Sequence, residues 1–199
     1  MILVTGFDPF GDEPWNASFE AVRGLEGEVI EGRAIAARCL PTEYEAGPRV
    51  LAALVAALDP EIVVVTGQAK PDDPVRLETT FFNEADASRS DNAGRWPDGL
   101  VIDPAGESVR GSLVPLDRVA SALDPSTGAV LSDDAGRFVC NAVGYRLAEL
   151  GRPAIFVHVP SYGSRDEAGR RALESANRAA IRAVVAALLR VVSGPSIAV

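Results

Sequence analysis

Histidine and cysteine are scarce in this chain of 199 residues, which has a single histidine, His158, and two cysteines, Cys39 and Cys140. Two cysteines are too few for a disulfide framework, so we expect both to be free thiols. One histidine and two distant cysteines, with no clustered ligand spacing, do not make a zinc site. Any chemistry that needs an imidazole must therefore belong to His158.

Positive charge and long apolar runs are also in short supply. The chain has 19 Lys and Arg against 28 Asp and Glu, a formal net charge of −9, so its long-range field repels nucleic acid and anionic membrane surfaces. The longest apolar stretches, at 50–58 and 183–189, are far shorter than the roughly 20 residues of a membrane-spanning helix. Because the opening residues MILVTGF lack the features of a secretory signal, we expect a cytoplasmic protein.

Hydrophobic residues make up 47% of the chain and fall into short runs separated by helical patterns. A chain of this length can bury one full core, and we expect a single domain over residues 1–199. Runs rich in Val and Ile that are apolar on both faces suit a mostly parallel sheet. The predicted fold is therefore α/β, one three-layer domain with a mostly parallel twisted sheet flanked by helices. The expected strands are 2–6, 33–40, 61–67 and 154–159, and the expected helices are 16–27, 42–60, 141–150 and one that starts near 164 and ends before the tail 193–199.

Three of these helices begin with recognisable capping residues. Asn16 heads the first, and an asparagine at such a position typically accepts a hydrogen bond from the first turn. The patterns Thr42-x-x-Glu45 and Ser164-x-x-Glu167 predict where the second and the last helix begin, because each matches a capping box.

The segment 69–111 differs in composition from the rest of the chain. It is rich in Asp, Pro, Gly and Ser and has one aromatic strand-like piece, TTFFN. A long irregular segment in a compact domain is more often a working loop than filler. We interpret it as a functional loop.

Cys140 and His158 are the first candidates for chemistry. Cys140 precedes a helical pattern, where the helix dipole and unpaired N–H groups favour a thiolate with a pKa near roughly 4 to 7 and could stabilise an oxyanion. His158 closes a predicted strand, and ligands bind at the carboxyl ends of strands in open parallel sheets. Both also have a structural interpretation, as a buried thiol and a structural histidine. Cys39, with no helix directly after it, is predicted to be a packing residue.

Several motifs together resemble one family of enzymes. The chain contains MILVTGFDPFG (1–11), VVTGQA (64–69), LETTFFN (77–83), SDNAG (90–94), FVCN (138–141) and FVHVPSY (156–162). In order and approximate spacing these resemble the pyrrolidone-carboxylate peptidases, also called pyroglutamyl peptidase I. The resemblance covers nearly the whole chain. It implies a cytoplasmic cysteine exopeptidase without a cofactor, acting on peptides with an N-terminal pyroglutamate and assembled as a homo-oligomer, either a dimer or a tetramer.

The resemblance also implies roles for individual residues. The family's catalytic triad corresponds to Glu78, Cys140 and His158. Cys140 would attack the pyroglutamyl carbonyl, His158 would transfer the proton, and Glu78 would orient the imidazole. In the family, the phenylalanines of the N-terminal motif hold the lactam ring. The substrate-binding candidates are Phe7, Phe10, Gln68 and Phe138.

Three stretches depart from the family pattern, one of them TTFFN (79–83), where the family usually has RVAxN. The family usually continues GQAGGR, whereas this chain has Lys70, Pro71 and two acids after GQA. Where the family has an arginine near the active site this chain has Ser88, followed by Arg89 as the candidate to stabilise the oxyanion. These departures leave two alternatives open: a thiol amidohydrolase of the same fold with a different small acyl group, and a catalytically weak pyroglutamyl-binding homologue.

Overall fold

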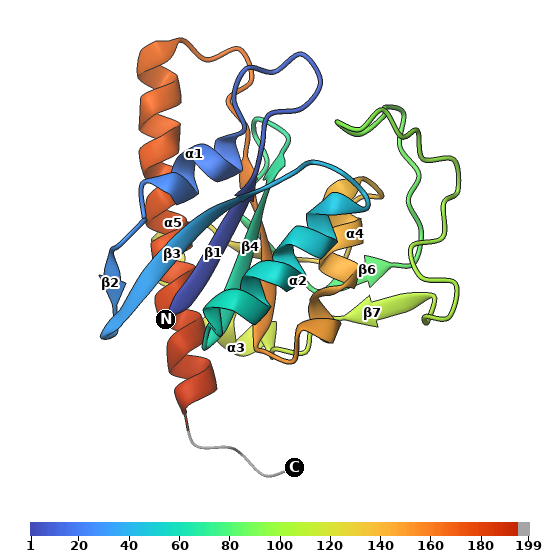
Figure 1. Ribbon diagram of the computed structural model, residues 1–199. Helices are drawn as coiled ribbons and strands as arrows, with labels where there is room; N and C mark the ends of the chain where they lie inside the picture. The colour runs from blue at the N-terminus through green and yellow to red at the C-terminus, as the bar shows by residue number, and fades with distance from the viewer. Residues whose placement is uncertain (195–199) are drawn as a thin grey trace.

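Seven strands form the central sheet of the computed structural model, which describes residues 1–194 (Figure 1). In spatial order the strands are β2 (Val29–Ile30), β3 (Arg33–Leu40), β1 (Ile2–Phe7), β4 (Ile62–Ala69), β9 (Ala154–Pro160), β5 (Arg76–Glu78) and β8 (Val130–Ser132). Parallel pairs join β3 to β1, β1 to β4, β4 to β9 and β5 to β8, while β2 runs antiparallel to β3 and β5 runs antiparallel to β9. The prediction of a mostly parallel sheet is therefore confirmed.

Helices cover both faces of this sheet. Side chains alternate between the faces of a strand, so Ile2 and Val4 of β1 enter one hydrophobic core and Leu3 enters the other. The first core includes side chains from α1 (Ala17–Arg23), α3 (Leu116–Ser121) and α5 (Glu167–Ser193), and the second includes side chains from α2 (Ala46–Leu58) and α4 (Val139–Tyr145). Figure 1 shows α5 running along one side of the sheet with α1, while α2 and α4 lie on the other side. No helix within residues 1–194 is long and apolar enough to cross a membrane.

The four predicted strands are confirmed, whereas several helix ends differ from the predictions. The first helix ends at Arg23, before the predicted limit of 27, and the predicted helix 141–150 is α4 followed by a short 3-10 helix, η2 (Leu147–Leu150). The last helix ends at Ser193, and the rest of the predicted helix-breaking tail lies largely outside the described residues.

Asn16 caps α1 as predicted, because its side chain accepts a hydrogen bond from Ser18 N. The two predicted capping boxes are wrong. Asp166, not Ser164, caps α5, since its carboxylate accepts from Gly169 N at 2.8 Å. Thr42 is used elsewhere: its N–H and hydroxyl both bind Asp8, at 2.7 and 3.0 Å, and α2 begins four residues later without a side-chain cap.

The predicted loop 69–111 is more structured than expected. It contains β5, which joins the central sheet, and a separate antiparallel pair, β6 (Thr80–Phe82) and β7 (Val109–Gly111). Beyond this segment lies another short 3-10 helix, η1 (Pro125–Thr127). The three-residue strands β5 and β7 are too short to show a periodicity in the sequence.

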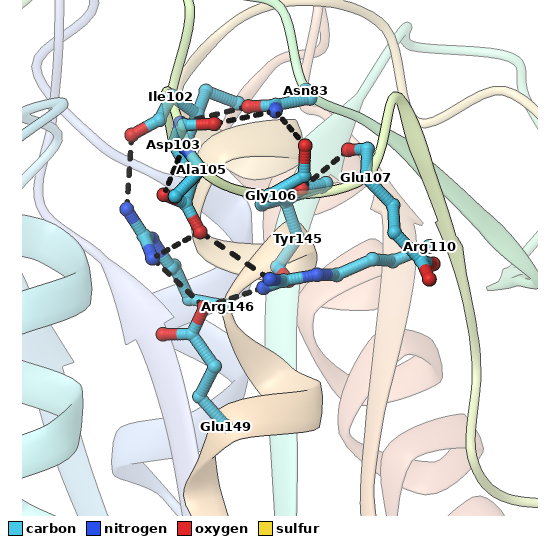
Figure 2. Close-up of polar contacts among 10 residues, drawn as sticks. All are labelled: Asn83, Ile102, Asp103, Ala105, Gly106, Glu107, Arg110, Tyr145, Arg146 and Glu149. Atoms are coloured by element: carbon cyan, nitrogen blue, oxygen red, sulfur yellow. Dashed lines mark hydrogen bonds and ion pairs between the residues drawn. The ribbon is translucent and has the colours of Figure 1, made fainter.

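A polar network holds residues 103–110 of this segment against the C-terminal end of α4, the helix that carries Cys140. Figure 2 shows Asp103 facing the guanidinium groups of Arg110 and Arg146, with Nη–Oδ2 distances of 3.3 Å each. The guanidinium carbon of Arg110 also lies 4.1 Å from the ring centroid of buried Tyr145. The Tyr145 hydroxyl donates a hydrogen bond to Glu107 O. The segment between β6 and β7 is thereby held against the end of α4.

Asn141, directly after Cys140, fixes the other end of α4. It is fully buried, its Oδ1 accepts from Phe82 N at 2.8 Å, and its Nδ2 donates to Phe82 O and Glu84 O, both at 2.8 Å. The side chain satisfies three backbone groups that are shut off from most of the solvent. The position of Cys140 therefore depends on β6.

We expect Asn141→Ala to lower the free energy of unfolding by about 2–4 kcal/mol, because three backbone groups would lose their partners. Urea unfolding followed by circular dichroism measures this. The matched control is Asn92→Ala, whose exposed amide also binds backbone and carboxylate oxygens; it should cost less than about 1 kcal/mol. Equal losses in the two variants would contradict the role given to Asn141.

Candidate active site

The carboxyl ends of β1, β4 and β9 converge on one cavity, as expected for an open parallel sheet. Its volume is about 500 Å³. Phe7 comes from the end of β1, Gln68 from β4, His158 from β9 and Cys140 from the first turn of α4. The wall also includes Phe10, Arg76, Arg89 and Phe138.

His158 is held by a buried carboxylate. Its Nδ1 lies 2.7 Å from Glu78 Oε1, and the exposed fractions of the two side chains are 4% and 0%. Burial favours the neutral acid, but the hydrogen bond and charge of His158, with smaller contributions from Ser132 and Arg76, outweigh it and lower the pKa of Glu78. Glu78 is therefore a carboxylate, which orients the imidazole with Nε2 directed away from it.

Cys140 and His158 meet over a glycine. A Cβ on Gly67 would lie 2.9 Å from Cys140 Sγ and 2.9 Å from His158 Nε2, so the two atoms are no more than twice that distance apart. Gly67 pairs with His158 in the register of β4 and β9. Only a residue without a side chain leaves room for both groups. This requirement was visible in the sequence only as the glycine of VVTGQA.

The prediction that the helix start lowers the pKa of Cys140 is wrong for this structure. Burial, followed by the negative charge of Glu78, raises the pKa of the Cys140 thiol to about 12, and Arg76 opposes this only in part. The helix α4 has seven residues, so its dipole is small against the effect of desolvation. Cys140 is therefore a neutral thiol, and the imidazole of His158 lies beside it.

Aromatic rings form one wall of the cavity. Phe10 and Phe138 have ring centroids 5.5 Å apart, and Tyr44 meets Phe138 edge-on at 5.6 Å. Phe7 is buried at the base, next to Phe156. The guanidinium carbon of Arg89 lies 5.5 Å from the centroid of the Phe10 ring, so the loop 83–108 contributes to the wall. Tyr44 supports Phe138 but does not itself line the cavity.

Gln68 lies in β4 rather than in a turn, and both ends of its amide are occupied within the protein. Its Oε1 accepts from Ala17 N at 2.7 Å, and its Nε2 donates to Glu13 Oε2 at 2.7 Å. It therefore links the end of β4 to the start of α1. The resemblance predicts that Gln68 also contacts a ligand. Its Oε1 has a second lone pair that is available for a hydrogen bond from such a ligand.

Cys39 is not a packing residue, because it is exposed on β3. The alternation of strand side chains turns Leu40 into the core and its neighbour Cys39 outward. Cys39 does not line the cavity, so Cys140 is the only thiol there. Within the described part of the chain, no group of three His, Cys, Asp or Glu residues could hold a metal ion.

Comparison with known proteins gives a consistent result. A family model described as pyroglutamyl peptidase matches residues 1–188. The pyrrolidone-carboxylate peptidase 1 of Ralstonia nicotianae is 39% identical over 166 residues, covering 80% of this chain and 77% of that protein. The pyrrolidone-carboxylate peptidase of Escherichia fergusonii is 32% identical over 197 residues, covering 94% and 92%.

Solved structures of pyroglutamyl peptidases resemble the fold of this chain. The pyroglutamyl peptidase I of Bacillus amyloliquefaciens superposes with a TM-score of 0.78 at 29% identity, covering 92% of this chain and 94% of that one. The pyrrolidone carboxyl peptidase of Pyrococcus furiosus gives a TM-score of 0.84 at 26% identity, covering 95% and 98%.

The raised pKa of Cys140 predicts how the thiol reacts. In a Cys39→Ser background, the rate at which iodoacetamide alkylates Cys140 should rise about tenfold per pH unit from pH 7 to 9, because the reactive thiolate is a small fraction throughout. Mass spectrometry of the labelled peptide measures the rate, and the Cys39→Ser/Cys140→Ser protein gives the background. A plateau near neutral pH would instead reveal a stable thiolate and contradict the assignment.

Proposed function

Because the chain belongs to the pyroglutamyl peptidase family, we propose that it is a cysteine exopeptidase that removes an N-terminal pyroglutamyl residue from peptides. The observation that carries the proposal is the arrangement of Glu78, His158 and Cys140 around Gly67. A carboxylate, an imidazole and a thiol in this order form a base and nucleophile of the triad type.

The reaction follows from this arrangement. His158 Nε2 takes the proton of Cys140 as Sγ attacks the carbonyl carbon of the pyroglutamyl residue, and Glu78 stabilises the imidazolium. The C–N bond then breaks, and the imidazolium donates its proton to the leaving amine. A thioester remains on Cys140. Water, deprotonated by His158, attacks the thioester, pyroglutamic acid leaves, and Cys140 recovers its proton.

The aromatic wall suits a pyroglutamyl group. A lactam is neutral and has no free α-amine, so its site needs flat apolar surfaces and a few polar partners rather than a carboxylate. Phe7, Phe10 and Phe138 offer such surfaces, and Gln68 offers an amide oxygen. We assign these four residues to lactam binding.

Two kinds of group can stabilise the oxyanion. One is Arg89, which lines the cavity and stacks on Phe10. The other is the set of backbone N–H groups in the first turn of α4, beside Cys140. Arg89 replaces the arginine that the family has at the position of Ser88. We propose that Arg89 supplies the charge and the backbone supplies the hydrogen bonds.

The remaining properties belong to the same proposal. The family resemblance and the net charge of −9 support a cytoplasmic enzyme with one catalytic domain over residues 1–199, working without a cofactor as a dimer or tetramer. Its partners are peptide substrates, not nucleic acid or membranes.

A second candidate function is favoured by the charged side chains around the cavity. Lys70 and Asp73 line it where the family usually has glycines and an arginine. Such a change affects specificity more than reaction type. The second candidate is therefore a thiol amidohydrolase that acts on a different small acyl group.

The first test is release of a fluorescent amine from a pyroglutamyl arylamide. We expect wild type and Cys39→Ser to hydrolyse it and Cys140→Ser to lose at least about 1,000-fold in kcat/KM, because the hydroxyl is a much weaker nucleophile for this site. Prolyl and acetyl-alanyl arylamides are measured alongside. Turnover of these but not of the pyroglutamyl compound would favour the second candidate, and no turnover by folded wild type would favour a binding protein.

A second variant tests whether activity requires the close approach of the Cys140 thiol and the His158 imidazole over Gly67. Gly67→Ala should lower kcat/KM about 100-fold, because the new methyl group displaces Cys140 Sγ or His158 Nε2 by a fraction of an ångström or more. Gly111→Ala is the matched control, since its Cβ would come no closer than 3.7 Å to Thr79 O. Equal activity of the two folded variants would show that the packing over Gly67 does not matter for the reaction.

A further inference from the structure

Arg76 shares an acceptor with the candidate catalytic base. Its Nε donates to Glu78 Oε1 at 3.0 Å, and the same oxygen lies 2.7 Å from His158 Nδ1. In the antiparallel register of β5 and β9, Arg76 lies directly opposite His158. Its guanidinium is therefore set beside the Glu78–His158 pair by the sheet itself, and the side chain also lines the cavity.

Glu78 has few other contacts. Its Oε2 is buried and has no hydrogen-bond partner within the described residues. Both strong contacts of the carboxylate, with Arg76 and with His158, therefore fall on Oε1. Without Arg76, the Glu78 carboxylate would keep only the imidazole and the weaker contribution of Ser132.

Arg76 is itself held in place. Its Nη1 donates to Asp73 Oδ2 at 2.9 Å, and a quarter of its side chain is exposed. Asp73, Arg76, Glu78 and His158 thus form a continuous chain of polar contacts that ends beside Cys140. Among the described residues, Arg76 is the only cation hydrogen-bonded to Glu78.

The charge of Arg76 bears on proton transfer. An imidazole that faces a buried carboxylate alone holds its proton tightly, and the same negative charge disfavours a nearby thiolate. A cation on that carboxylate weakens both effects. It makes ionisation of Cys140 less costly, consistent with the direction in which Arg76 moves the pKa of Cys140.

We propose that Arg76 is a positioning residue that holds Glu78 through Oε1 and adjusts the proton affinity of the His158–Cys140 pair. The inference rests on the proposed function for its catalytic meaning, but its effect on the thiol can be measured without a substrate. Other charged or titratable groups near Glu78, His158 and Cys140 come from several elements of the structure. They include Glu13, Tyr44, Lys70, Arg89 and Asp134.

A purely structural role makes a different prediction. If Arg76 only tied the segment before β5 to the sheet, its loss would lower stability but leave the pH dependence of Cys140 unchanged. Two readouts separate these cases: the pH dependence of alkylation by iodoacetamide in a Cys39→Ser background, and the pH profile of kcat/KM.

The test compares four variants. Arg76→Gln should slow alkylation at pH 7.5 about tenfold and move the acid limb of kcat/KM to higher pH by about one unit, because removing a nearby positive charge raises neighbouring pKa values. Arg76→Lys should largely restore both. Asp73→Asn should shift both readouts in the opposite direction, since it removes the negative charge behind Arg76. Arg33→Gln is the control, because Arg33 forms an exposed ion pair with Glu61 at the amino end of β3.

The results for the Arg76 variants distinguish between the inference, the proposed function and the role of charge. Alkylation and pH profiles of folded Arg76→Gln that match wild type would overturn the inference, whatever its stability. Slower alkylation without any pyroglutamyl hydrolysis by wild type would sustain the inference and overturn the proposed function. A loss in Arg76→Gln that Arg76→Lys does not recover at all would show that charge is not what Arg76 contributes.

Discussion

The buried hydrogen bond between Glu78 and His158 is the interaction on which the rest of the site depends. A carboxylate with no solvent exposure is costly unless it is paired, and here the partner is the only imidazole in the chain. The bond fixes which nitrogen of the ring faces the cavity. The short strand β5 lies between β9 and the edge strand β8 and runs antiparallel to β9, which places Arg76 directly opposite His158 and Glu78 opposite Phe156.

Packing around this bond is as restrictive as the bond itself. Gly67 leaves space for the thiol and the imidazole on the neighbouring strand, and Asn141 holds the start of α4 against β6. The polar network in Figure 2 then holds the far end of the same helix and loop. Cys140 is thus placed from two ends by contacts that involve no substrate. Such a site needs little reorganisation before reaction.

The sequence allowed the long strands and the candidate triad to be predicted, for different reasons. Strands such as β4 are continuous apolar runs, which periodicity and composition detect, whereas Glu78 emerged only through family resemblance. The short strand β5 and the contact of Thr42 with Asp8 depend on tertiary structure that no local pattern encodes. The cap of α5 is local, since Asp166 accepts from Gly169 N, but the sequence pattern Ser164-x-x-Glu167 offered a competing start. Cys39 was misjudged because its exposure depends on which face of β3 is covered.

The prediction of a lowered pKa for Cys140 was wrong because it considered only the local effect of the helix start and left out the rest of the pocket. A helix start does favour a thiolate, but a short helix acts weakly, while desolvation and a carboxylate in the same pocket act strongly. The result has a chemical consequence. A thiol that stays protonated until His158 accepts its proton is protected from oxidation and stray alkylation in the resting enzyme, since both require the thiolate. In the proposed mechanism, reactivity then depends on transfer of this proton to His158, and so on the charges of Glu78 and Arg76 beside the pair.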